Sequence, residues 1–154
     1  MTLDAVRALP FVSEPLPGVI TAGQPSAAHL AAFKAAGGSV VLDMREAHEP
    51  RGYDEAAEAA RLGLTYVHVP VGAGANTRND RTLERVRSTL REAPGPVLVH
   101  CASANRVGGA LLPVFILDHG MTEDDAIEAA LRVGLRAQDL AVWALEYARR
   151  HATP

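Results

Sequence analysis

The chain has 154 residues, of which 48% are hydrophobic and 21% charged. A chain of this length buries about two thirds of the surface that its unfolded form exposes, which predicts a single domain over residues 1–154. The net charge is −3, so no bulk basic surface argues for nucleic-acid binding. The single cysteine excludes an intrachain disulfide.

The N-terminus lacks the features of a membrane span and of an export signal. It has neither a run near 18 apolar residues nor a basic region followed by an apolar core. We therefore expect a cytoplasmic protein without a membrane partner, and the sequence leaves open whether an export signal was removed.

Strand and helix signals alternate along most of the chain. Residues 1–18 contain three prolines and predict an irregular N-terminal arm. Together the later signals predict an α/β fold with a mostly parallel central sheet of about four strands and helices on both faces. The predicted strands are 19–21 at a sheet edge, 40–44, 65–69 and 97–99, and the predicted helices are 26–36, 53–62, one from 80, one from about 106, 122–133, and one around 140–147.

The stretch from Val97 to Gly109 is the one that suggests chemistry. Its apolar strand stops at Cys101, and small residues then lead to Arg106, where a buried helix should begin. At a helix N-terminus, free backbone N–H groups and the helix dipole bind anions and favour the nucleophilic thiolate. Arg106 adds a permanent charge and a planar fork for an oxyanion. We predict that Cys101 is a nucleophile and that an anion is held by Arg106 and by the backbone amides of Ala102, Ser103, Ala104, Asn105 and Arg106.

Polar residues around this loop are weaker candidates. His100 could support the thiolate or only end a buried strand. Asp43 and Arg45 follow a strand and should lie at the same sheet edge, where Arg45 and Glu49 could form a bracing ion pair. The scattered histidines form no recognisable metal set, and the sequence predicts no cofactor.

At these residues the sequence resembles the cysteine-dependent phosphatases of the tyrosine and dual-specificity type. Within them it is similar to a bacterial branch, the beta-lactamase-hydrolase-like phosphatase-like group (DUF442), some members of which are described as sulfurtransferases. The resemblance covers roughly residues 15 to 135 and implies a phosphatase-like fold with a cysteine nucleophile. The segments that carry it are 21–26 (TAGQPS), 40–45 (VVLDMR) with Glu49, 66–71 (YVHVPV), and His100-Cys101 with the loop to Arg106.

The loop departs from the phosphatase pattern in two ways. Phosphatases of this type place five residues between cysteine and arginine, whereas this loop has four, as rhodanese-like sulfurtransferases do. One residue fewer removes about 3.5 Å of contour, and the smaller ring suits a persulfide sulfur better than three phosphoryl oxygens. Both families often have a glycine where Ala104 stands. Because alanine at a positive φ is costly, we expect either a different turn or accepted strain.

A general acid is hard to find in the sequence. In the phosphatases, the loop corresponding to residues 72–79 delivers an aspartate that protonates the leaving oxygen. Here the nearest carboxylate is Asp80, which should begin a helix and is a weak candidate, and Asp43 is weaker still. A leaving group such as sulfite needs no proton, which favours sulfur transfer.

These observations predict an enzyme that acts on a small anionic substrate. The favoured hypothesis is a sulfurtransferase that moves sulfane sulfur from thiosulfate or a glutathione persulfide, through a Cys101 persulfide, to a thiol or cyanide acceptor. One alternative is a tyrosine or dual-specificity-type phosphatase that acts through a cysteinyl-phosphate. A second alternative is a non-catalytic module that binds an anion or a phosphoprotein.

Overall fold

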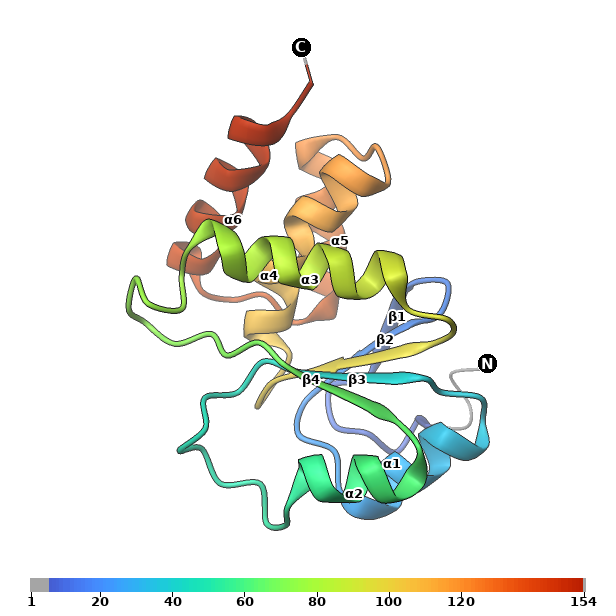
Figure 1. The fold of residues 1–154 in the computed structure, drawn as a ribbon. Helices are drawn as coiled ribbons and strands as arrows, with labels where there is room; N and C mark the ends of the chain where they lie inside the picture. The colour runs from blue at the N-terminus through green and yellow to red at the C-terminus, as the bar shows by residue number, and fades with distance from the viewer. Residues whose placement is uncertain (1–5, 154) are drawn as a thin grey trace.

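Residues 6–153 are described by a computed structural model in which strands alternate with helices (Figure 1). The strands are β1 (Ser13–Leu16), β2 (Val19–Ala22), β3 (Val40–Asp43), β4 (Thr65–His68) and β5 (Val97–His100). The helices are α1 (Ala27–Ala35), α2 (Glu55–Leu62), α3 (Asp80–Glu92), α4 (Asn105–Pro113), the π-helical turn η2 (Val114–Asp118), α5 (Glu123–Val133) and α6 (Gln138–His151).

The five strands form one sheet in the order β1-β2-β5-β3-β4. Strands β2, β5, β3 and β4 are parallel, and β1 is antiparallel to β2. Helices α1 and α2 cover one face, and α3 to α6 cover the other (Figure 1). The predicted fold class is confirmed, with one strand more than expected.

The extra strand corrects two predictions. Residues 13–16 are not part of an irregular arm but form β1, and β2 is therefore not an edge strand. Pro15 is tolerated because β1 lies at the sheet edge and its register shifts between the pairs Ser13–Thr21 and Leu16–Val19. The beginning of the predicted arm, residues 1–5, lies outside the described residues.

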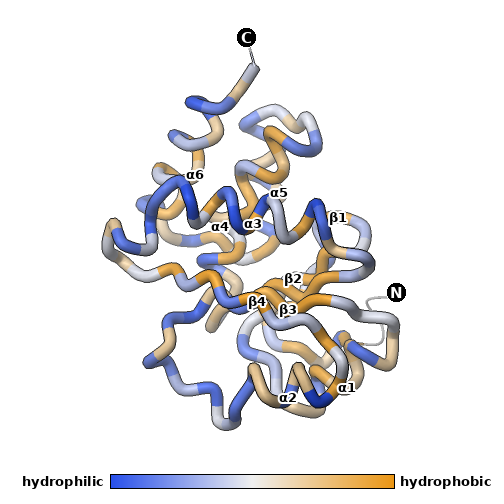
Figure 2. Tube along the Cα trace, in the orientation of Figure 1, coloured by the Kyte–Doolittle hydropathy of each residue, from blue (hydrophilic) through white to orange (hydrophobic). Residues whose placement is uncertain are grey.

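The central strands are buried on both faces. In β5, Val97 and Val99 pack into a core shared with α3 to α6, whereas Leu98 packs into a second core with α1 and α2. Strands enclosed in this way form near-continuous hydrophobic runs, visible as orange segments in the middle of Figure 2. The sheet thus fixes the positions of the residues that follow its strands.

Local sequence signals set most helix ends. Ser26 caps α1 in a capping box with His29, Gly63 ends α2 at a φ of 79°, and Thr122 caps α5. Each of these ends was predicted. No helix within residues 6–153 has both the length and the apolar character needed to cross a membrane.

Candidate active site

Cys101 lies between β5 and α4, as predicted, and is only 1% exposed. Its backbone N–H donates to the carbonyl of Ala22 at 3.3 Å, and Ser103 forms an isolated bridge with Gly23. A Cβ on Gly23 would lie 2.5 Å from the carbonyl oxygen of Ala102, so this position needs glycine. The segment after β2 therefore supports one side of the loop.

Ala104 has a strained backbone conformation, which is one of the two outcomes expected from the sequence. It has a φ of 65° and a ψ of 2°, in the left-handed region, and it is fully buried at the N-terminus of α4. The turn between α5 and α6 lies directly on it, because a Cβ on Gly134 would be 3.1 Å from the Cβ of Ala104. Tight packing thus holds a conformation that alanine rarely adopts.

Arg106 projects from the first turn of α4 and is held by Glu49. Its Nη1 donates to Glu49 Oε2 at 2.7 Å, its Nη2 donates to Glu49 Oε1 at 2.9 Å, and Nη1 also donates to the carbonyl of Val71 at 3.1 Å. The hydrogen bonds from Arg106 lower the pKa of Glu49 to about 2. The hydrogen bonds to Glu49 raise the pKa of Arg106, and the charge interaction with the nearby Cys101 thiol raises it further. This geometry brings the two predicted catalytic residues together.

The predicted ion pair of Arg45 and Glu49 is present. Arg45 Nε donates to Glu49 Oε1 at 3.2 Å, and Nη1 donates to Gln24 Oε1 at 2.9 Å. Glu49 therefore lies between two arginines. Arg45 therefore contacts Glu49, the same carboxylate that holds Arg106, as expected of a supporting residue.

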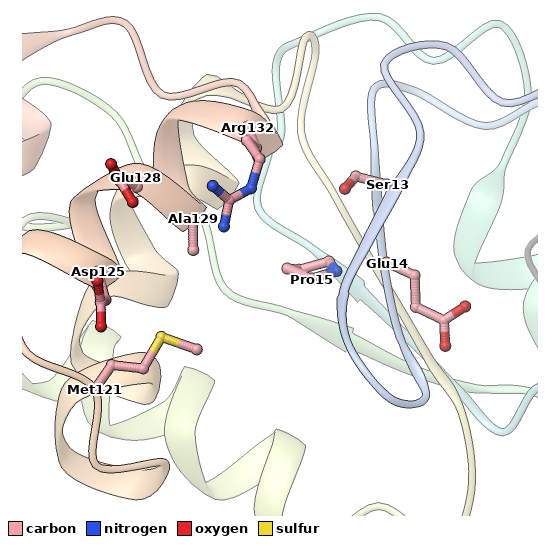
Figure 3. A pocket seen from close by; sticks show the side chains of 8 residues that line it. All are labelled: Ser13, Glu14, Pro15, Met121, Asp125, Glu128, Ala129 and Arg132. Atoms are coloured by element: carbon pink, nitrogen blue, oxygen red, sulfur yellow. The ribbon is translucent and has the colours of Figure 1, made fainter.

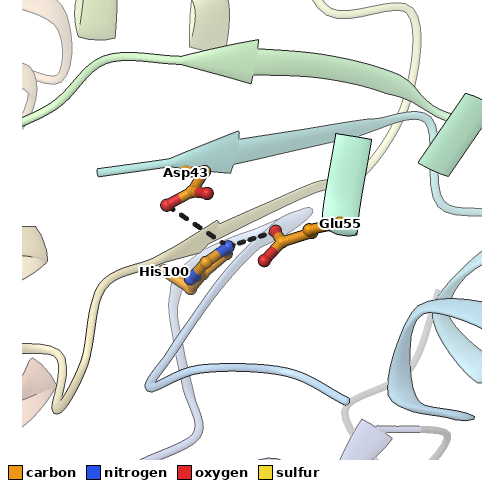
Figure 4. Close-up of side chains that lie close together, drawn as sticks. All are labelled: Asp43, Glu55 and His100. Carbon is orange, nitrogen blue, oxygen red and sulfur yellow. Dashed lines mark hydrogen bonds and ion pairs between the residues drawn. The ribbon is translucent and has the colours of Figure 1, made fainter. Parts of the chain in front are cut away.

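His100, the residue before Cys101, belongs to a buried cluster with Asp43 and Glu55 (Figure 4). Its Nε2 lies 2.5 Å from Glu55 Oε2 and 3.8 Å from Asp43 Oδ1, and all three side chains are at least 99% buried. The other ring nitrogen, Nδ1, is 3.4 Å from the carbonyl oxygen of Cys101. The histidine that precedes Cys101 is thus held between two carboxylates.

Arg51 and Tyr66 complete this cluster. Arg51 Nε donates to Asp43 Oδ2 at 2.8 Å, and the Tyr66 hydroxyl donates to the same oxygen at 2.5 Å. Burial by itself would raise the pKa of Asp43, but these hydrogen bonds, one from the backbone of Arg45 and the charge of His100 outweigh burial and lower it. Asp43 is therefore an ionised structural partner.

The same cluster has the residue types of a metal centre. Ligand atoms of Asp43, Glu55 and His100 lie within 4.8 Å of one another. However, every carboxylate oxygen already accepts a hydrogen bond: those of Asp43 from Arg45, Arg51 and Tyr66, and those of Glu55 from Gln24 and His100. A cation would have to displace these donors, so we interpret the cluster as an ion-pair network.

The structure places Asp80 away from these contacts. It is the first residue of α3, and its carboxylate pairs with Arg150 at 2.5 Å on α6. Residues 71–79, which precede it, contain no aspartate or glutamate. A different carboxylate, that of Glu46, packs against Gly72, since a Cβ there would lie 2.6 Å from it. Among the described residues, Glu46 has no side-chain hydrogen bond or ion pair.

Three contributors to the site were missed by sequence reasoning. Arg51 lies before α2 and Glu55 is its first residue. Only the folded chain brings Glu55 to His100 and Arg51 to Asp43. Arg136, in the turn between α5 and α6, donates from Nη2 to Ser103 Oγ at 2.7 Å. The only sequence signal for them is residue type, because charged residues beside a helix start usually cap it or face solvent.

A cavity lies apart from the loop of residues 101–106. A cavity of about 400 Å³ between β1 and α5 is lined by acidic residues, Met121 and Arg132, with Pro15 on the opposite side (Figure 3). None of its lining residues belongs to the loop 101–106, and the hollow contains no cysteine. It therefore adds nothing to the site around Cys101.

The mostly parallel sheet, with the loop from Cys101 to Arg106 between β5 and α4, has the architecture of a phosphatase-like fold. Residues 43–111 match the family model described as the beta-lactamase hydrolase-like protein, phosphatase-like domain. Over these residues, the match agrees with the resemblance seen in the sequence. No curated protein matches the chain in sequence.

Solved structures support the same fold. A DUF442 phosphatase candidate from Shewanella putrefaciens CN-32 superposes with a TM-score of 0.78 at 17% identity, over 99% of this chain and 100% of that one. Tk-PTP in its active form gives a TM-score of 0.74 at 18% identity, over 92% and 98% of the two chains. PTPMT1 in complex with PI(5)P gives 0.73 at 15% identity, over 92% and 99%.

Proposed function

We propose that the protein is a cysteine-dependent sulfurtransferase that carries sulfane sulfur on Cys101. The observation that carries this proposal is the state of the carboxylates that contact the site. Arg106 holds Glu49 ionised, with a pKa of about 2, and Asp43 is likewise held ionised. Neither can protonate a leaving oxygen at neutral pH. Chemistry whose leaving group departs as a stable anion is therefore favoured.

The transfer balances without an added proton or oxidant. The Cys101 thiolate attacks the outer sulfur of thiosulfate, the sulfur–sulfur bond of the donor breaks, and sulfite leaves with the electron pair. The product is a Cys101 persulfide, whose negative charge faces Arg106 and the amides at the start of α4. A thiolate acceptor then attacks the terminal sulfur, and the Cys101 thiolate is regenerated.

A phosphatase is the second candidate, supported by one observation. The carboxylate of Glu46 packs against Gly72 and lacks a partner among the described residues, so it is the acid that this activity would use. Relatives in fold also bind phosphoesters: TpbA from P. aeruginosa was solved with phosphotyrosine, and PTPMT1 with PI(5)P. Under this alternative, Cys101 forms a cysteinyl-phosphate, and Asp80 stays paired with Arg150 and takes no part.

Intact-mass spectrometry after brief exposure to thiosulfate separates the candidates. Sulfur transfer predicts a gain of about 32 Da that a reductant removes, and Cys101→Ser should prevent it while leaving the fold intact. Turnover of p-nitrophenyl phosphate is measured in parallel with Glu46→Gln. Ester turnover that needs Cys101 and Glu46, without a sulfur adduct, would replace the sulfurtransferase with the phosphatase. Absence of both reactions would leave only an anion-binding module.

A further inference from the structure

Arg136 is held against the catalytic loop without a carboxylate to neutralise it. Its Nη2 donates to Ser103 Oγ at 2.7 Å and its Nη1 donates to the carbonyl of Gly134 at 3.1 Å. No ion pair of Arg136 occurs among residues 6–153. By contrast, the other arginine at this loop, Arg106, is paired with Glu49. Arg136 is therefore an exposed, fully charged fork with capacity for an anion.

The backbone around Arg136 is fixed to the loop. Asn105 Oδ1, from the first residue of α4, accepts from the backbone N–H of Arg136 at 2.7 Å and of Ala137 at 3.1 Å. Gly134 packs against Ala104 from the same turn. Arg136 is therefore held at its backbone and at its guanidinium. Binding a ligand then costs little further side-chain conformational freedom.

Ser103 places the Arg136 guanidinium close to Cys101. It is two residues after Cys101, so their Cα atoms are at most about 7.6 Å apart. Its hydroxyl accepts from Arg136 and donates to no acceptor among the described residues, which leaves its hydrogen for a ligand. Ser103 is half-buried and Arg136 exposed, so the pair lies at the rim of the site and not in its centre.

We propose that Arg136 and the Ser103 hydroxyl form a subsite for a second anionic group of the substrate. The group transferred to Cys101 binds at Arg106, and a carboxylate, sulfonate or phosphate a few bonds away binds at the rim. The substrate class is thus a molecule with two anionic centres. Because this inference deepens the proposed function, its test has to work even if Cys101 transfers neither sulfur nor phosphate.

Unreactive sulfonates provide that test by calorimetry on the full chain. Propane-1-sulfonate offers one anionic group, and propane-1,3-disulfonate and butane-1,4-disulfonate offer two at different spacings. We expect at least one disulfonate to bind about fivefold to tenfold more tightly than the monosulfonate, the factor for one exposed charge-assisted hydrogen bond. Arg136→Gln should abolish that advantage and change monosulfonate binding less than twofold.

Arg132→Gln is the matched control. Arg132 is also exposed, loses the same charge on substitution, and lies on α5 at the separate cavity of Figure 3. The disulfonate advantage should persist in this variant. An advantage that survives in Arg136→Gln, that disappears equally in Arg132→Gln, or that is absent from the unsubstituted protein would overturn the subsite, as would no measurable disulfonate binding.

Steady-state kinetics then test whether the substrate uses this subsite. If Cys101 forms a persulfide, glutathione persulfide and its diester, which lacks free carboxylates, are compared as donors. Arg136→Gln should raise KM about fivefold more for the first donor than for the second. Equal changes for both donors would contradict an anion subsite. If no persulfide forms, the proposed function fails, while the sulfonate titrations still decide the subsite.

Discussion

The buried cluster around His100 makes a quantitative prediction for Glu55→Gln. Glu55 is 2% exposed and lies 2.5 Å from His100 Nε2 and 3.8 Å from Arg51 Nε. Replacing its carboxylate by an amide keeps the shape but removes one negative charge. Two basic side chains then share the single carboxylate of Asp43, inside a region that excludes water.

The size of the effect follows from burial. Removing one partner of a buried pair costs about 3–5 kcal/mol because the remaining charge is uncompensated. Glutamine keeps one oxygen that can accept from His100, so we expect the lower end, about 3 kcal/mol in the free energy of unfolding. For a domain of this size, that loss lowers Tm by roughly 6–12 °C.

Urea and thermal unfolding measure this loss, with Glu58→Gln as the control. Glu58 lies one turn further along α2, and its carboxylate pairs with Arg61 at the surface. That substitution should change the urea midpoint little, because exposed ion pairs contribute little to the free energy of unfolding. If Glu55→Gln costs no more than Glu58→Gln, then the cluster does not hold His100 by charge, and Glu55 is not a supporting residue of the loop.

Three further predictions concern the loop itself. Arg106→Lys keeps the charge but loses the paired contact with Glu49, so activity should fall at least about 100-fold while the fold persists; near-normal rates would show that the fork is dispensable. Because the pKa of Glu49 is about 2 in the folded protein and ordinarily 4.5, its stabilisation is complete above pH 4.5 and is lost as pH falls toward 2. The urea midpoint should therefore decline over this window, and less in Glu49→Gln; parallel curves would contradict the pairing. Ala104→Gly relieves about 1–2 kcal/mol of strain but loses a buried methyl and some chain rigidity, so its free energy of unfolding, measured in urea, should stay within about 1 kcal/mol of the original. Gly134→Ala, which crowds the same Cβ, should destabilise by more, and the reverse order would refute the packing described here.

The parts of the fold that the sequence predicts are those set by neighbouring residues. Ser26 and Gly63 mark helix ends because capping and a positive φ depend on local chemistry alone. The β-branched run at Val97 predicts a buried strand for the same reason. Strand β1 was missed because Pro15 argues against a strand, unless the strand is known to lie at a sheet edge.

In the candidate site too, residues that are close in sequence were predicted, whereas residues brought together by folding were not. Cys101 and Arg106 are close in sequence, so one loop indicates both. Glu55 lies 45 residues before His100, and their contact depends on how α2 packs beside the sheet. Arg136 lies 33 residues after Ser103, in a turn whose sequence has no special signal. Such contacts follow from tertiary packing and cannot be read from periodicity or spacing.

The strain at Ala104 and the short loop have a common consequence. In a loop with glycine at this position, the turn would be permitted by the backbone alone. Here it is imposed from both sides, by Gly23 against Ala102 and by Gly134 against Ala104. Because close packing permits few alternative arrangements, the loop is fixed before any ligand arrives. A ring that is one residue shorter than that of the phosphatases has less contour to enclose three phosphoryl oxygens. Its close packing is the reason we give loop length weight in proposing sulfur transfer.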